Sequence, residues 1–90
     1  MNPESFQEYI RRHRRLFWDI REDAVENLSL SAVVETILKY GHISDIRELI
    51  DLAGIDQVYK IFQQQISGKR VNYPKRTLHF FKLYFEKHAS

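Results

Sequence analysis

Apolar residues recur along most of the chain at intervals of three and four positions, the spacing that gathers side chains on one face of an α-helix. In the first such stretch they occupy an arc of roughly 120° on a helical wheel. Asn2 followed by Pro3 is typical of a helix start, because asparagine caps helices and proline fits the first helical position. The sequence therefore predicts a first helix whose inward face carries Phe6, Tyr9, Ile10, His13, Leu16 and Phe17.

The same periodicity predicts four more helices further along the chain. Residues 19–30, before the second helix, show no clear apolar stripe and are expected to form a loop or a short turn. Capping residues and glycines mark the expected boundaries. The helices are predicted to run from Ser31 to Gly41, from Ser44 to Gly54, from Asp56 to Gly68, and onward from Pro74.

No segment alternates between apolar and polar residues for long enough to predict a strand, so the predicted fold class is all-α. From the length of the chain we expect residues 1–90 to form a single compact domain of about five short helices. Nine of the twelve aromatic residues lie in the two outer helices. This distribution predicts that the N- and C-terminal helices pack together, with Trp18 closing the small core.

Composition narrows the class of protein. The chain has no cysteine and no apolar run long enough for a membrane span, and its first residues lack the layout of a secretion signal, so we expect a cytoplasmic protein. The net charge of +2 is unevenly distributed. Residues 1–30 carry a net −1, residues 31–66 a net −2 and residues 67–90 a net +5. Such an asymmetry suggests an anionic partner for the basic end.

The segment RRHRRLFWD, residues 11–19, places four arginines around a histidine. On the helical wheel the arginines face away from the apolar arc, whereas His13 lies within it. His13 is therefore predicted to be a buried residue with a hydrogen-bonded ring nitrogen. The arginines are predicted to be the solvated side of the helix, where the helix dipole favours positive charge in the last turns.

The segment GKRVNYPKRTLHF, residues 68–80, is the strongest candidate for binding an anion. Two of its cations fall in the first turn of the last helix, where the dipole disfavours positive charge by roughly 0.3–1 kcal/mol each. Three interpretations remain open: solvated or internally paired charge, an acidic protein partner, and nucleic acid. The candidate anion contacts are Lys69, Arg70, Lys75 and Arg76.

The amino-acid sequence contains none of the common catalytic motifs that we considered. The histidines match no zinc-binding spacing, and the chain has neither a nucleophile elbow nor a phosphate-binding loop. The sequence therefore predicts a protein that is not an enzyme and that uses no metal or cofactor.

Residues 45–62, DIRELIDLAGIDQVYKIF, resemble the helix-turn-helix of bacterial repressors. The match is incomplete, because Ile50 falls where a small residue is expected and Lys60 where an apolar residue should point inward. The spacing from Gly54 to Tyr59 is also short. A small DNA-binding regulator with an atypical helix-turn-helix is the alternative function.

A wider resemblance, to a protein family, rests on three short motifs. They are LFWD at residues 16–19, YG at 40–41 with DIREL at 45–49, and TLHFF at 77–81. Across residues 16–85 the chain resembles a family of small, uncharacterised bacterial helical domains. The family more often has tryptophan at the positions of Glu48 and Phe81, and an acid at His42. Its members are often encoded beside nucleotidyltransferase toxins of the abortive-infection type.

The resemblance implies an antitoxin-like protein that binds such a toxin. Together with the aromatic last helix, it leads us to expect a protein-interaction domain, with a homodimer as an alternative assembly and nucleic acid as an alternative partner. The predicted partner-binding residues are Tyr73, Phe80, Phe81 and Tyr84.

Overall fold

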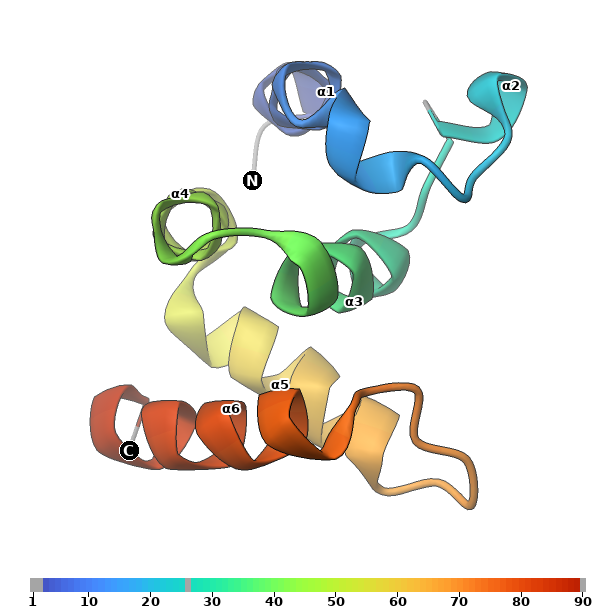
Figure 1. The fold of residues 1–90 in the computed structure, drawn as a ribbon. Helices are drawn as coiled ribbons and strands as arrows, with labels where there is room; N and C mark the ends of the chain where they lie inside the picture. The colour runs from blue at the N-terminus through green and yellow to red at the C-terminus, as the bar shows by residue number, and fades with distance from the viewer. Residues whose placement is uncertain (1–2, 26, 90) are drawn as a thin grey trace.

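The computed structural model describes residues 3–25 and 27–89, and over these residues it contains six α-helices, one 3₁₀ turn and no strand (Figure 1). The predicted all-α fold class is confirmed. The proposed cap at Asn2 lies outside the described residues. The elements are α1 (Pro3–Arg12), η1 (Arg14–Phe17), α2 (Glu22–Val25), α3 (Leu30–Tyr40), α4 (Ile43–Ala53), α5 (Ile55–Ile66) and α6 (Lys75–His88).

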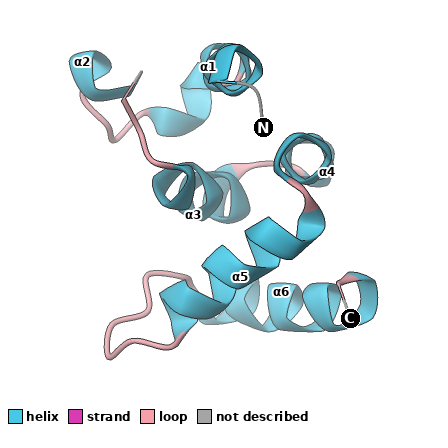
Figure 2. Cartoon of the chain, turned by 180° about the vertical axis from the view of Figure 1, so that it is seen from behind, coloured by secondary structure: helices cyan, strands magenta, loops and turns pink. Residues whose placement is uncertain are grey.

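The helices are stacked so that the first and the last helix lie far apart (Figures 1 and 2). Helices α1 and α2 form one end of the molecule, α6 forms the other, and α3, α4 and α5 lie between them. The prediction that the first and last helices pack together is therefore wrong. The central helices cover both apolar faces instead, because α1 packs on α4 and the aromatic face of α6 packs on Phe62 of α5.

The first helix is shorter than the sequence pattern predicts. α1 ends at Arg12, and the chain continues through His13 into the 3₁₀ turn η1. The amide of His13 is shared between the carbonyls of Tyr9 and Ile10, at 3.1 and 3.2 Å, which marks the transition to tighter turns. The periodic positions Leu16 and Phe17 are still buried, because η1 packs on α3.

Trp18 follows this turn and points away from the core. Its side chain is 71% exposed, so the prediction that it closes the core is wrong. On the helical wheel Trp18 already falls outside the inward arc, and its exposure agrees with that position. The expected loop after Trp18 contains the short helix α2, which buries Val25.

Helices α3 and α4 begin earlier than predicted and have other caps, and α5 begins at Ile55 rather than Asp56. α3 is capped by Ser29, whose hydroxyl accepts a hydrogen bond from the amide of Ala32, rather than by Ser31. α4 follows His42, and its first turn is fixed by Asp45, whose carboxylate accepts from the amide of His42 at 2.8 Å. The Asp45 side chain, at the third position of the helix, therefore caps α4 in place of Ser44.

The predicted helix stops at the first two glycines are confirmed, whereas α5 ends at Ile66, before Gly68. Gly54 alone joins α4 to α5, with a φ of 88° that favours glycine. The helical pair of residues 45–62 is therefore present. It lacks the turn of three to four residues that a helix-turn-helix uses, and Lys60 is exposed.

Candidate interaction surface

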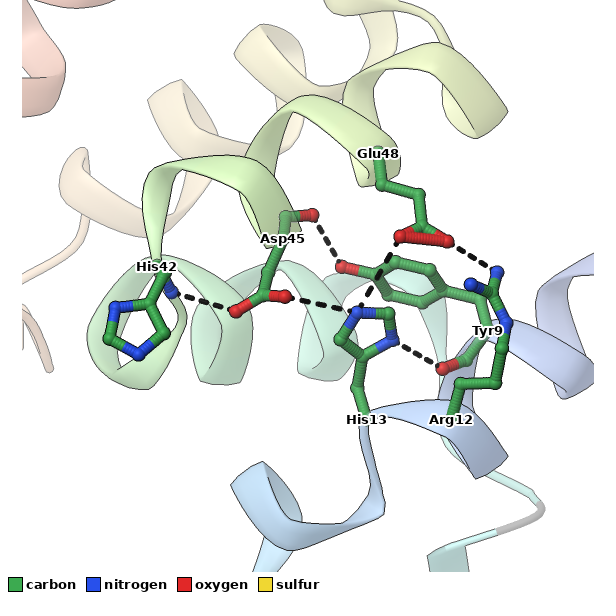
Figure 3. Close-up of polar contacts among 6 residues, drawn as sticks. All are labelled: Tyr9, Arg12, His13, His42, Asp45 and Glu48. Carbon is green, nitrogen blue, oxygen red and sulfur yellow. Dashed lines mark hydrogen bonds and ion pairs between the residues drawn. The ribbon is translucent and has the colours of Figure 1, made fainter.

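A cluster of polar side chains joins α1 to α4 in the interior (Figure 3). The Nδ1 atom of His13 donates to the carbonyl oxygen of Tyr9 at 2.8 Å, and its Nε2 atom lies 3.1 Å from Oδ1 of Asp45. The Tyr9 hydroxyl donates to the carbonyl oxygen of Asp45 at 2.8 Å. Both ring nitrogens of His13 therefore face oxygen atoms of the protein, one on α1 and one on α4.

The outer edge of this cluster is closed by Glu48 and Arg12. The Glu48 carboxylate pairs with the Arg12 guanidinium and lies 3.6 Å from the His13 ring. Burial, together with the carboxylates of Asp45 and Glu48, raises the pKa of Tyr9 above its ordinary value. The prediction of a buried, hydrogen-bonded His13 is confirmed. The prediction that it shares no face with the arginines is wrong for Arg12, because both side chains contact the Glu48 carboxylate. The partners of His13 are all on the protein, so the cluster holds α1 on α4.

A groove of about 350 Å³ opens on the other side of α4, where the end of α3 and the start of α4 approach the first half of α6. Its polar lining consists of Lys39, Thr77 and Arg76, and the backbone of Gly41 forms part of one wall. Apolar side chains supply the rest of the lining. They are Leu38, Ile43, Ile46, Phe80 and Phe81.

The groove has a buried floor and an exposed apolar rim. Leu38, Ile46 and Phe81 are each 3% exposed, whereas Ile43 is 42% and Phe80 is 50% exposed. The Phe80 ring lies edge-on to Phe81, with ring centroids 5.0 Å apart, and half of its surface remains exposed. Exposed large apolar side chains that border a preformed groove are typical of a binding surface.

The four cations singled out in the sequence are all exposed. Arg76 lines the groove, and Lys75 precedes it at the start of α6. Lys69 and Arg70 lie in the loop between α5 and α6. Among the described residues none of the four has an ion pair or hydrogen bond, which excludes the internally paired interpretation for this part of the chain.

The loop that carries these cations is anchored to α3. Asn72 donates to the Glu35 carboxylate at 3.0 Å, and the Tyr73 hydroxyl donates to the side chain of Gln65. Gln65 in turn donates to the backbone carbonyl of Ser31 at 2.8 Å. Burial, and secondarily the charge of Glu35, raises the pKa of Tyr73 above its ordinary value.

The four predicted partner-binding aromatics occupy different environments. Phe80 forms the rim of the groove and Phe81 its floor. Tyr84 is half-buried beside Phe80 and His88, outside the groove. Tyr73 is only 5% exposed and packs on Phe62, so its ring belongs to the core and is not available to a partner.

Three further residues of this surface were not predicted from the sequence. Ile43 completes the rim of the groove, and Lys39 lies on the wall opposite α6. Tyr40, which is 40% exposed, contacts the Trp18 ring at a centroid distance of 5.9 Å and lies under the Lys39 ammonium. The LFWD and YG motifs are thus brought together at the surface, which their positions in the sequence do not indicate.

A second pocket of about 290 Å³ lies between α5 and α6. Lys82 and Glu86 both line it, so its charged groups favour neither sign of ligand. The groove at α3, α4 and α6 is therefore the better candidate site.

Metal binding and membrane insertion find no support in the described residues. Nowhere in residues 3–25 and 27–89 do three or more histidine or acidic side chains gather as metal ligands would. No helix within the same ranges has the length and apolar character needed to cross a membrane.

Comparison of the chain with protein-family models, with curated proteins and with solved structures finds no match.

Proposed function

We propose that this chain is a non-catalytic protein-binding domain with an antitoxin-like role toward a nucleotidyltransferase-type toxin. The groove between α3, α4 and α6 is the observation that carries the binding role. The class of partner is supported by the family resemblance of residues 16–85. A cytoplasmic location belongs to the same proposal, since a chain without cysteine suits a reducing compartment.

Support for protein binding comes from the combination of exposed apolar groups with unpaired charge. Half of the Phe80 surface and two fifths of the Ile43 surface remain in contact with water, although both side chains border a formed groove. Covering such a patch gives about 25 cal/mol for each Å² of apolar area removed from water. A partner supplies that cover without any rearrangement of this fold.

Support for a non-catalytic role comes from the His13 cluster. A histidine, a tyrosine and two carboxylates lie together, which is a frequent composition for catalytic sites. Here each group bonds to another group of the protein, and none of the cluster residues lines either pocket. The polar groups of the cluster therefore bond to one another, which supports a structural role for them.

The decisive experiment is isolation of the tagged protein from its native cell. We expect a companion protein in stoichiometric amount, and we expect Phe80→Ala to lose it. Leu83→Ala is the matched control, because Leu83 is 55% exposed on the same helix but does not line the groove. Co-expression should also restore growth to cells that produce the companion. Absence of any stoichiometric companion would contradict the proposal.

Nucleic-acid binding is a second candidate function, favoured by the four exposed cations without partners. A small DNA-binding regulator would use Lys69, Arg70, Lys75 and Arg76, as a monomer or homodimer, and an autoregulating antitoxin would combine both functions. Binding of duplex DNA should then weaken steeply with salt, and each Lys or Arg removed should reduce the slope by about one. Failure to retard DNA at low salt excludes this function.

A further inference from the structure

We infer that the groove between α3, α4 and α6 binds a segment of another protein in which an apolar anchor residue is flanked by carboxylates. The inference rests on the proposed protein-binding function and specifies the chemistry of the partner. It follows from the two kinds of groups that meet in the groove, apolar side chains in its centre and cations on opposite walls.

The centre of the groove calls for an apolar side chain. Its floor is formed by Leu38, Ile46 and Phe81, which offer no polar side-chain atom, and its rim by Ile43 and Phe80. An inserted leucine or phenylalanine would cover the exposed faces of both rim residues. Aromatic and aliphatic pockets of this kind supply most of the binding free energy at protein interfaces.

The walls of the groove require negative charge. Lys39 projects from the end of α3 and Arg76 from the first turn of α6, so cations stand on both sides of the apolar centre. No carboxylate among the described residues pairs with either of them, and α6 has no acidic residue in its first turn. A carboxylate beside Arg76 would also be favoured by the dipole at the start of α6.

A protein segment satisfies these groups better than nucleic acid does. Phosphates would neutralise Lys39 and Arg76 but would leave the apolar floor without a partner. A peptide places an apolar side chain and carboxylates at adjacent or helically spaced positions, as in the recognition of amphipathic segments by apolar grooves.

The surface continues beyond Lys39. The Lys39 ammonium lies 5.3 Å from the centre of the Tyr40 ring, and that ring contacts Trp18. A Trp side chain that is 71% exposed beside a second exposed aromatic is a frequent anchor of binding energy. The same partner segment is therefore expected to extend from Phe80 across Lys39 to the aromatic pair of Tyr40 and Trp18.

Selection from a random displayed-peptide library on the full chain tests this inference. We expect enriched peptides to carry aspartate or glutamate on both sides of a leucine, isoleucine, phenylalanine or methionine. Failure to enrich any peptide, or enrichment of peptides without acidic residues, overturns the inference.

Measured affinities of the enriched peptides provide the second test. Phe80→Ala and Arg76→Glu should each weaken binding about tenfold or more, since each removes a central contact. The controls Leu83→Ala and Lys87→Glu likewise truncate an apolar side chain and reverse a positive charge on α6, but outside the groove. They should leave affinity within about threefold. Equal losses in variants and controls, with thermal melting unchanged in all four, overturn the inference.

Other occupants give distinct results. Sedimentation that shows a dimer of the wild-type chain and a monomer of Phe80→Ala assigns the groove to a second copy and overturns the inference. Displacement of the peptides by DNA in a Phe80-dependent manner does the same in favour of nucleic acid. A stoichiometric companion that Phe80→Ala retains contradicts the inference but leaves the proposed function standing.

Discussion

The Nε2 atom of His13 lies 3.1 Å from Oδ1 of Asp45, and this contact joins the end of α1 to the first turn of α4. The other oxygen of the same carboxylate accepts from the backbone amide of His42. Asp45 therefore caps its own helix and holds a second helix at once. Figure 3 shows both contacts, with the Tyr9 hydroxyl on the Asp45 carbonyl beside them.

Replacing Asp45 by alanine should destabilise the fold. The change leaves His13 without its carboxylate partner in a site where its side chain is 9% exposed, and it removes the cap of α4. Leaving a buried ring nitrogen without its hydrogen-bond partner costs about 1–3 kcal/mol. Chemical denaturation should show this loss, whereas Asp51→Ala, an exposed position on the same helix, should change stability by less than about 0.5 kcal/mol. Equal effects would contradict the structural role of the cluster.

Stability should fall in alkaline solution because two tyrosines are buried. Burial raises the pKa of Tyr9 and Tyr73 above the ordinary value of about 10, so the folded chain keeps protons that the unfolded chain releases. The contribution is intact below about pH 10 and is lost as the pH rises further, by up to about 1.4 kcal/mol per tyrosine at pH 11.

Urea denaturation at about pH 9 and pH 11 measures this effect. The variant that combines Tyr9→Phe and Tyr73→Phe lacks both phenol groups and should lose less stability over the same interval than the wild type. An equal loss would mean that other groups cause the alkaline response.

Gly41 should tolerate no side chain. A Cβ atom at this position would lie 2.7 Å from the carbonyl oxygen of Ile37 and 3.3 Å from the Cβ of Asp45. Gly41→Ala should therefore lower the free energy of unfolding by about 1–3 kcal/mol. Gly68→Ala is the control, since no atom lies within 4 Å of its added Cβ, and its effect should stay within about 0.5 kcal/mol. Thermal melting of both variants gives the comparison.

Adjacent phenylalanines on α6 should behave differently. Phe81 is 3% exposed and packs on Phe62 and Phe85, so Phe81→Ala should cost about 3–5 kcal/mol. Phe80 is half exposed, and Phe80→Ala should cost less than about 1 kcal/mol. A large loss in Phe80→Ala would mean that its ring supports the core rather than a partner.

The local pattern of apolar residues was sufficient to predict most of the helices and the residues that they bury. The predicted inward positions of the second helix, Val33, Val34, Ile37 and Leu38, are all buried in α3. Helical periodicity depends on contacts between residues three and four apart, which are present in the sequence itself. The same logic placed His13 in the interior, but it did not anticipate that Arg12 would join His13 at the Glu48 carboxylate.

The candidate site was only partly accessible to such reasoning. Phe80 and Arg76 were singled out because they lie in an aromatic and basic segment, and both line the groove. Tyr73 has the same local character, yet its ring is taken into the core by Phe62 and Gln65. Exposure depends on which neighbours a helix acquires, and a wheel drawn for one helix contains no information about them.

By itself the sequence determined that the chain is all-α, where four of its helices lie, and that positive charge gathers at its basic end. The tertiary structure decided that α1 and α6 lie at opposite ends, that the first helix gives way to a 3₁₀ turn at His13, and that Trp18 meets Tyr40 at the surface. The physical reason is the distance along the sequence between the residues that interact. Helix formation is set by neighbours along the chain, whereas the groove exists only where three helices converge.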